Sequence, residues 1–163
     1  MKKTMILLGL SAGFLGLQCT PKKTATQEST AADLQAETGL YATLEGQNNG
    51  PDSVIVRFTV TNPTADTLRF TTYHTPFEGM ISRFLDVTDA QGNAVSYGGP
   101  MVKRVTPPPA NTYRTLAPAQ SESVTFDLKK GYNIEKAGTY TLRYNGEKIS
   151  GIANGRPLVI EVR

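Results

Sequence analysis

The chain has 163 residues, which is enough for one domain and a short leader. Its formal net charge at pH 7 is +3, from 17 basic and 14 acidic residues. If Lys2 and Lys3 leave with a leader, only one more basic than acidic residue remains. The chain then lacks the concentrated basic surface that nucleic-acid binding needs. A single cysteine excludes a disulfide within the chain.

The N-terminus has the plan of a secretory signal peptide over residues 1–18. Lys2 and Lys3 form a positive start, and Met5–Leu17 is an apolar run without charge. That run is shorter than the roughly 20 apolar residues that a membrane-spanning helix needs. We therefore predict a leader that is removed after export.

Cys19 follows the apolar run, as the acylated cysteine of a bacterial lipoprotein does. The segment Leu15–Cys19 resembles a lipobox, with Gly16 where leucine is usual and Gln18 where a small residue is usual. We predict cleavage before Cys19 and a lipid on its thiol, which would anchor the protein to a membrane. The alternative is an ordinary cleaved signal with an unmodified cysteine. The expected location is the cell envelope, at the periplasmic face of the outer membrane rather than the cell surface.

Residues 19–38 are polar and small, and they bury too little apolar surface to offset the entropy of ordering. We predict a flexible tether there and a folded domain over residues 39–163. Short alternating runs separated by turn residues predict the strands of this domain: Leu40–Glu45, Ser53–Asn62, Thr67–Thr72, Ser82–Thr88, Ala94–Tyr97, Ser121–Leu128, Gly138–Tyr144 and Leu158–Val162. The expected fold is all-β, an immunoglobulin-like antiparallel sandwich of about seven or eight strands without a disulfide.

The strongest predicted strand is Ser53–Asn62, because one of its faces carries only apolar side chains: Val54, Val56, Phe58 and Val60. Ser82–Thr88 and Ala94–Tyr97 flank the turn residues Asp89–Asn93 and predict a β-hairpin. The following Thr106–Ala110 contains three prolines in a row. We expect it to be a stiff, extended connection.

The predicted domain contains no recognisable catalytic constellation. His74 is the only histidine, so the paired histidines of a zinc peptidase are missing. The domain also lacks a GxSxG nucleophile motif, and Cys19 lies outside it. We predict no enzyme, no metal and no cofactor, with His74 as a surface or loop-packing residue. A hydrolase that uses His74 would need a nucleophile within hydrogen-bond reach.

Five segments occur in an order that resembles a known family: Thr75–Gly79, Phe84–Arg104, Leu116–Pro118, Phe126–Leu128 with Tyr132, and Ala137–Tyr144. The family is the N-terminal propeptide-like domain of deuterolysin-type peptidyl-Lys metalloendopeptidases. A looser similarity links the chain to bacillar intracellular proteinase inhibitors. The zinc-binding catalytic domain of the metalloendopeptidases would follow this module, whereas this sequence ends at Arg163. The resemblance implies a pro-domain-like sandwich that stands alone and has no metal ligands.

The first functional hypothesis is a monomeric, protease-associated binding module that inhibits, chaperones or docks a peptidase. Its predicted contact surface combines the loops Tyr97–Arg104 and Tyr73–Glu78, and its candidate residues are Tyr73, Phe77, Tyr97, Met101, Lys103 and Arg104. Lys103 or Arg104 could enter an acidic specificity pocket in the manner of a substrate. The alternative for these two cations is an exposed strand edge that charge protects from pairing.

The second hypothesis is a structural or adhesive envelope lipoprotein that binds glycan or another envelope protein. Tyrosine rings stack well on sugars when they are exposed, and the chain has seven: Tyr41, Tyr73, Tyr97, Tyr113, Tyr132, Tyr140 and Tyr144. An exposed aromatic cluster would favour adhesion, and a protruding rigid loop would favour peptidase binding.

Overall fold

The computed structural model describes residues 39–163. The predicted signal peptide, the lipid site at Cys19 and the tether lie outside the described residues. The strands are β1 (Tyr41–Asn49), β2 (Val54–Thr61), β3 (Leu68–Thr71), β4 (Leu85–Asp89), β5 (Tyr113–Leu116), β6 (Ser121–Asp127), β7 (Gly138–Tyr144) and β8 (Leu158–Val162). The helical turns are η1 (Pro76–Glu78), η2 (Ala110–Thr112), η3 (Leu128–Lys130) and α2 (Glu147–Ser150).

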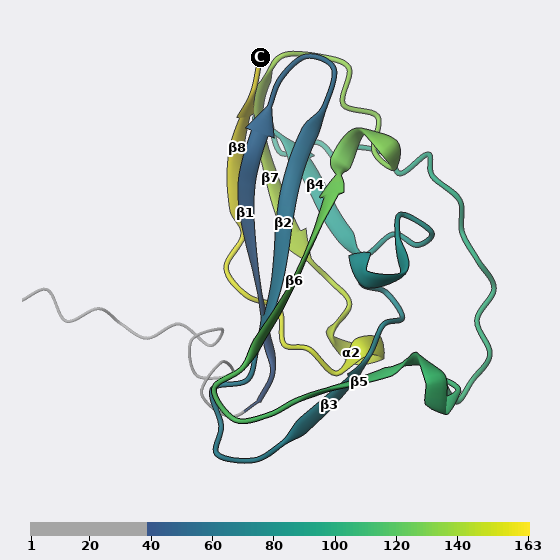
Figure 1. The fold of residues 1–163 in the computed structure, drawn as a ribbon. Coiled ribbons are helices and arrows are strands. Elements are labelled where there is room, and N and C mark those ends of the chain that lie inside the picture. The colour runs from purple at the N-terminus through teal and green to yellow at the C-terminus, as the bar shows by residue number, and fades with distance from the viewer. Residues whose placement is uncertain (1–38) are drawn as a thin grey trace, which may run out of the picture.

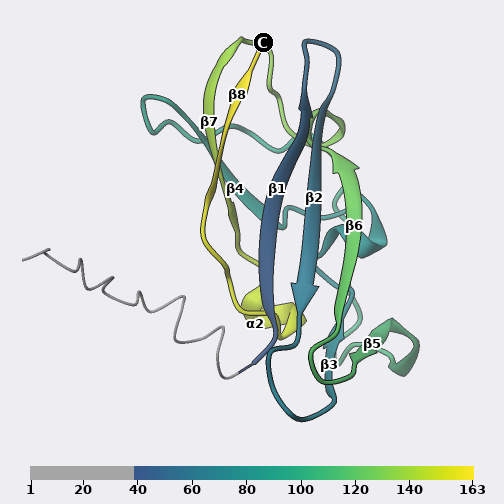
Figure 2. The same cartoon turned by 60° about the vertical axis from the view of Figure 1, so that its left-hand side comes forward.

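Two antiparallel sheets form the sandwich. One sheet has the order β1-β2-β6 and the other has the order β4-β7-β8. The views in Figures 1 and 2 show these sheets as two layers, and the ring centroids of Phe58 in β2 and Tyr144 in β7 lie 5.0 Å apart between them. The short pair β3-β5 lies at one end of the sandwich. The predicted all-β antiparallel sandwich without a disulfide is confirmed.

The alternating pattern of the sequence predicted which side chains form the core. The four apolar side chains predicted on one face of β2 are fully buried: Val54, Val56, Phe58 and Val60. In β7, Tyr140, Leu142 and Tyr144 are buried on the facing layer. Burial of an apolar side chain of this size contributes about 1.5–3 kcal/mol to folding, so these two strands supply much of the stability of the sandwich.

The predicted hairpin after β4 is present only in part. β4 begins at Leu85 rather than Ser82, and Ala94 forms an isolated bridge with Thr88. Tyr97 does not pair with β4 but forms a bridge with Tyr132. The second arm therefore leaves the sheet early, because its last residue is held by the chain that follows β6.

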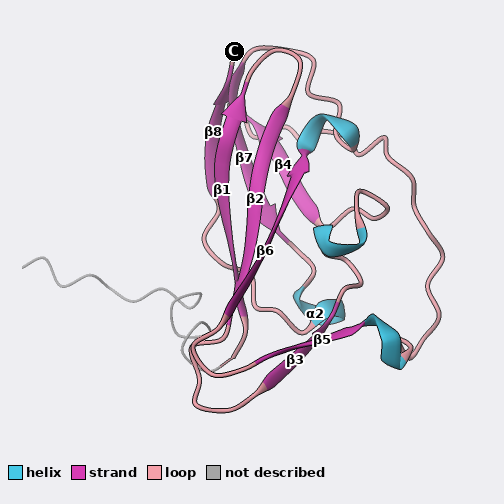
Figure 3. Ribbon diagram, in the orientation of Figure 1, coloured by secondary structure: helices cyan, strands magenta, loops and turns pink. Residues whose placement is uncertain are grey.

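A long connection runs from this arm to η2 and β5. Figures 1 and 3 show it as a loop that passes along the side of the molecule, away from the two main sheets. Residues 98–109 of this connection have no helix or strand. The connection begins near η3 and ends at β5, which pairs with β3. It is the longest stretch of the described chain without regular secondary structure.

The Tyr132 hydroxyl joins the end of this region to β4. The side chain is buried, the hydroxyl donates to the Leu85 carbonyl oxygen (2.7 Å), and the Leu85 N–H donates back to the hydroxyl oxygen (3.1 Å). Burial raises the pKa of Tyr132, so the hydroxyl stays protonated. These two hydrogen bonds give a partner to both the N–H and the carbonyl oxygen of Leu85, which is fully buried.

We expect Tyr132→Phe to lower the free energy of unfolding by about 2 kcal/mol, because it leaves the Leu85 N–H and carbonyl without partners. Urea unfolding monitored by circular dichroism measures the change. Tyr140→Phe is a matched control, since its hydroxyl donates a single hydrogen bond, to the Lys136 carbonyl oxygen (2.9 Å). Equal losses in the two variants would contradict the role assigned to Tyr132.

Candidate functional site

The most exposed apolar side chains of the long connection lie in Pro100–Val105, here called the presenting segment. Met101, Val102 and Val105 are 72%, 48% and 65% exposed, and Lys103 is also exposed. Large apolar side chains at this exposure, grouped around a cation, are typical of contact surfaces rather than of a solvated loop. The predicted contact residues Met101 and Lys103 both lie here.

Backbone pairing with the η3 turn fixes the chain just before the presenting segment. The N–H groups of Gly98 and Gly99 both donate to the Gly131 carbonyl oxygen, at 2.9 and 3.2 Å. The Tyr97 ring packs edge-on against Tyr132, with centroids 5.1 Å apart. A Cβ added to Gly131 would lie 2.8 Å from Cε2 of Tyr97, so only glycine permits this close approach. The segment therefore begins from a fixed point on the core.

Two further contacts hold the first half of the presenting segment. The Tyr97 hydroxyl lies within donating distance of the carbonyl oxygens of Met80 (3.0 Å) and Pro100 (2.9 Å). The Val102 N–H donates to the Ile81 carbonyl oxygen (3.2 Å). Tyr97 thus stabilises the segment from its inner side and is only partly exposed. Burial raises the pKa of its hydroxyl, which keeps it a donor.

Arg104 turns inward and holds the second half. Its guanidinium forms an ion pair with Glu78 and lies 4.6 Å from the centroid of the Tyr73 ring. The side chains of Arg104 and Glu78 are only 19% and 10% exposed. A cation over an aromatic face is attracted by the ring electrons, more strongly where water is excluded. Arg104 is therefore an anchor of the presenting segment on the body.

Glu78 is held in place from the opposite side. Its Oε1 accepts hydrogen bonds from the His74 N–H (3.2 Å) and the Ser82 hydroxyl (3.3 Å). The Thr75 hydroxyl caps η1 by accepting from the Phe77 N–H (3.3 Å). Burial raises the pKa of Glu78, and the positive charge of Arg104 opposes that rise. The carboxylate therefore depends on Arg104 for its charged form.

His74 is part of this support. It has a positive φ of 55°, a conformation that is uncommon for a residue other than glycine. This backbone geometry accompanies the bond from its N–H to Glu78. Burial and the charge of Arg104 lower the pKa of the imidazole, so the ring is neutral at pH 7.

The structure separates the predicted contact residues into two groups. Met101 and Lys103 face solvent, whereas Tyr73 is buried beneath Arg104. Phe77 packs against Phe58, Phe70 and the Arg114 guanidinium. The residues that hold the presenting segment in place are thus Tyr73, Phe77, Tyr97 and Arg104. The predicted contacts that remain on the exposed surface are Met101 and Lys103. The segment is also not a strand edge, because it has no strand pairing.

Sequence reasoning missed one residue of the site, Val105, and it included Glu78 and Val102 in the predicted loops without naming a role for them. Val105 lies on the exposed surface, and Glu78 forms the buried half of the ion pair. Glu78 and Arg104 are far apart in sequence, and nothing in their spacing links them. Val105 directly precedes the Pro-rich stretch, and only its position beside Lys103 could have indicated it.

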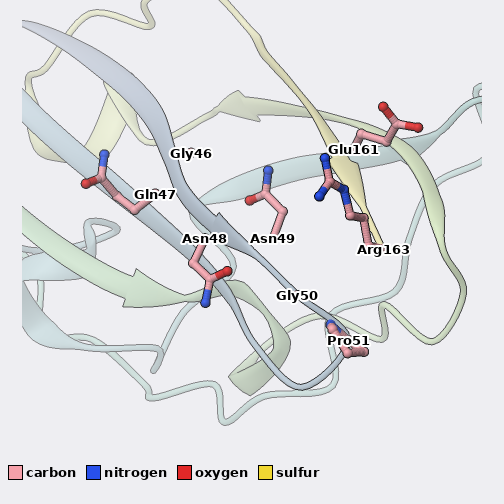
Figure 4. Close-up of a pocket in the computed structure, with 8 residues that line it drawn as sticks. All are labelled: Gly46, Gln47, Asn48, Asn49, Gly50, Pro51, Glu161 and Arg163. Carbon is pink, nitrogen blue, oxygen red and sulfur yellow. The ribbon is translucent and has the colours of Figure 1, made fainter.

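A concave feature separate from the presenting segment lies at the opposite end of the sandwich from β3 and β5. It is an open hollow of about 460 Å³ between the β1–β2 turn and the end of β8, lined by Gly46, Gln47, Asn48, Asn49, Gly50, Pro51, Glu161 and Arg163. Figure 4 shows Glu161 on β8, and Arg163 directly after β8, across from Asn49. The Asn49 Oδ1 atom is buried there without a hydrogen-bond partner. The lining is mostly polar, and its cation and anion lie two residues apart at the end of the chain.

No helix within residues 39–163 is long and apolar enough to cross a bilayer. The same range contains no group of three or more His, Cys, Asp or Glu side chains placed to hold a metal ion. Comparison with known proteins found no matching family model and no matching curated protein sequence.

Proposed function

We propose that the chain is a non-catalytic lipoprotein of the bacterial envelope, and that its sandwich domain binds a peptidase through the presenting segment. The observation that carries the proposal is the combination of exposure and anchoring in Pro100–Val105. Apolar side chains and one lysine face solvent, while backbone hydrogen bonds before Lys103 and the Arg104 side chain after it tie the segment to the core. A loop fixed in its bound shape loses less conformational entropy on binding, which raises affinity.

Two sequence features support the location and the class of partner. The leader and Cys19 fit a lipid-anchored protein exported from the cytoplasm. The resemblance to peptidase pro-domains and to proteinase inhibitors favours a peptidase as partner. A short tether would let the domain reach such a partner while the lipid stays in the membrane.

The arrangement of the tyrosines weakens the adhesive alternative. Sugar stacking needs exposed ring faces, and all seven tyrosines belong to the described part of the chain. None of them is exposed: Tyr73, Tyr132, Tyr140 and Tyr144 are buried, and Tyr41, Tyr97 and Tyr113 are half-buried. The surface therefore offers a rigid loop and no aromatic platform, which favours peptidase binding.

A capture experiment tests the proposal. The full chain, purified in mild detergent, is immobilised and exposed to an envelope extract of a bacterium that encodes it. We expect the resin to deplete a peptidase activity from the extract. The matched control replaces residues 101–105 with Gly and Ser, and its fold is checked by urea unfolding. No depletion, or equal depletion by the control, would contradict the proposal.

A further inference from the structure

Within the presenting segment, one inward side chain interrupts a run of exposed ones. Met101, Val102, Lys103 and Val105 are exposed, and Arg104 alone turns into the body. Met101, Lys103 and Val105 thus present two apolar side chains with a cation between them.

The backbone of the same three residues is free to pair with another chain. Among residues 39–163, only Val102 of the stretch 101–105 donates its N–H to a protein acceptor, the Ile81 carbonyl. The N–H groups of Met101, Lys103 and Val105 have no acceptor within that range. An extended peptide that binds as an added strand gains affinity from such main-chain groups and specificity from alternate side chains.

The positive charge of Lys103 indicates which kind of specificity pocket a partner would have. Lys103 has no ion-pair partner in the described chain, whereas the neighbouring Arg104 is already neutralised by Glu78. The side chains that flank Lys103 on the outward side, Met101 and Val105, are apolar. A complementary cleft would therefore have one acidic pocket between two apolar subsites.

From these observations we infer that the presenting segment occupies the substrate cleft of a peptidase whose primary specificity pocket carries a carboxylate, with the Lys103 side chain in that pocket. This rests on the proposed function and adds the chemistry of the partner. The contacts that hold the segment lie on both sides of Lys103: the Tyr97 hydroxyl and the Val102 N–H before it, and the Arg104 guanidinium after it. They hold the backbone in place in the cleft, so the chain acts as an inhibitor rather than as a substrate.

The test measures inhibition of three serine peptidases by the full chain in mild detergent. Trypsin has an aspartate in its specificity pocket, chymotrypsin has an apolar slot and elastase a small one. We expect competitive inhibition of trypsin, with weak or no inhibition of the other two. Removing the charged partner of a buried pair costs about 2 kcal/mol or more, so Lys103→Met should raise the inhibition constant for trypsin about 30-fold or more.

Two variants sharpen this test. Lys136→Met removes an exposed lysine of the β6–β7 connection and should leave inhibition unchanged. Lys103→Phe should shift the preference from trypsin to chymotrypsin, because the ring fits an apolar slot. Gain of chymotrypsin inhibition would show that the variant is folded and that position 103 enters the pocket.

The outcomes separate this inference from the proposed function. Inhibition of trypsin that Lys103→Met does not change, or preferred inhibition of chymotrypsin or elastase by the unmodified chain, overturns the inference and leaves peptidase binding intact. Rapid cleavage after Lys103, seen by intact mass, also overturns it. No inhibition of any of the three overturns it as well. The proposed function itself is contradicted only by the capture experiment, through no depletion or equal depletion by the control.

Discussion

Replacing Arg104 with Met should lower the free energy of unfolding by about 3 kcal/mol, because removal of one partner leaves a buried charge uncompensated. Glu78, 10% exposed in the unmodified chain, would keep hydrogen bonds from His74 and Ser82 but have no cation. Methionine keeps an apolar stem of similar length but lacks the guanidinium, so the loss includes the ion pair and the contact of the cation with the Tyr73 ring. Urea unfolding at pH 7 measures this change.

The same variant should show a distinctive dependence on pH. Arg104 lowers the pKa of Glu78, so its removal raises that pKa further above the ordinary value of 4.5. The folded variant then binds a proton that the unfolded chain releases, and its stability increases as the pH falls from 7 towards 4.5. The difference between the variant and the unmodified chain should shrink over that range.

A surface ion pair provides the control for Arg104. Arg83 and Asp86 form a salt bridge of 2.7 Å in which both side chains are largely exposed. Exposed pairs contribute little, with typical values below about 1 kcal/mol, so Arg83→Met should have a small effect. Equal losses for Arg83→Met and Arg104→Met, or a loss at Arg104 that does not change with pH, would contradict the anchoring role of the ion pair.

Replacing Phe58 with Ala should lower the free energy of unfolding by about 3–5 kcal/mol, the usual cost of truncating a fully buried phenylalanine. The ring centroid of Phe58 lies 5.0 Å from that of Tyr144 and 6.0 Å from that of Phe77. Phe77 belongs to η1, the turn that carries Glu78. The cavity would therefore remove packing between the sheets and loosen the base of the support.

Thermal and urea unfolding of Phe58→Ala check this effect. Val159→Ala is the control, since Val159 is exposed on the neighbouring sheet in β8, and it should change stability by less than about 0.5 kcal/mol. A loss below about 2 kcal/mol in Phe58→Ala would show that the site relaxes around the missing ring, and would contradict tight packing beneath η1.

The sequence predicted the central strands well because their burial is periodic. β7 and β8 occupy the ranges that their alternation indicated, β6 is one residue shorter than predicted at its end, and β2 is one residue shorter at each end. Each of these strands has one face against the core, so local pattern and tertiary environment agree. β1 was predicted to end at Glu45, yet it continues to Asn49 through an irregular register between Gly46 and Asn48.

The elements that sequence reasoning missed depend on distant partners. β5 has only four residues and pairs with β3, which is far away in the chain. The four-residue α2 was also missed, because one helical turn leaves no periodic pattern. Ala94–Tyr97 alternates like a strand, but pairing with Tyr132 draws its end away from β4.

The sequence predicted where the candidate site lies, but not which of its residues are exposed contacts and which are buried supports. Lys103 and Arg104 are adjacent cations, and composition does not distinguish them. The ion pair with Glu78 assigns Arg104 to the support and leaves Lys103 for the surface. Tyr73 and Phe77 were predicted as contacts because they lie in the loop Tyr73–Glu78, but their rings are used in packing.

The proposed binding requires a presenting segment that is rigid before any partner arrives. Backbone amide order parameters of residues 101–105, measured by nitrogen-15 relaxation on the full chain, test this directly. Anchoring predicts order parameters near those of β2, about 0.85, whereas values below about 0.6 describe a flexible loop and would contradict it.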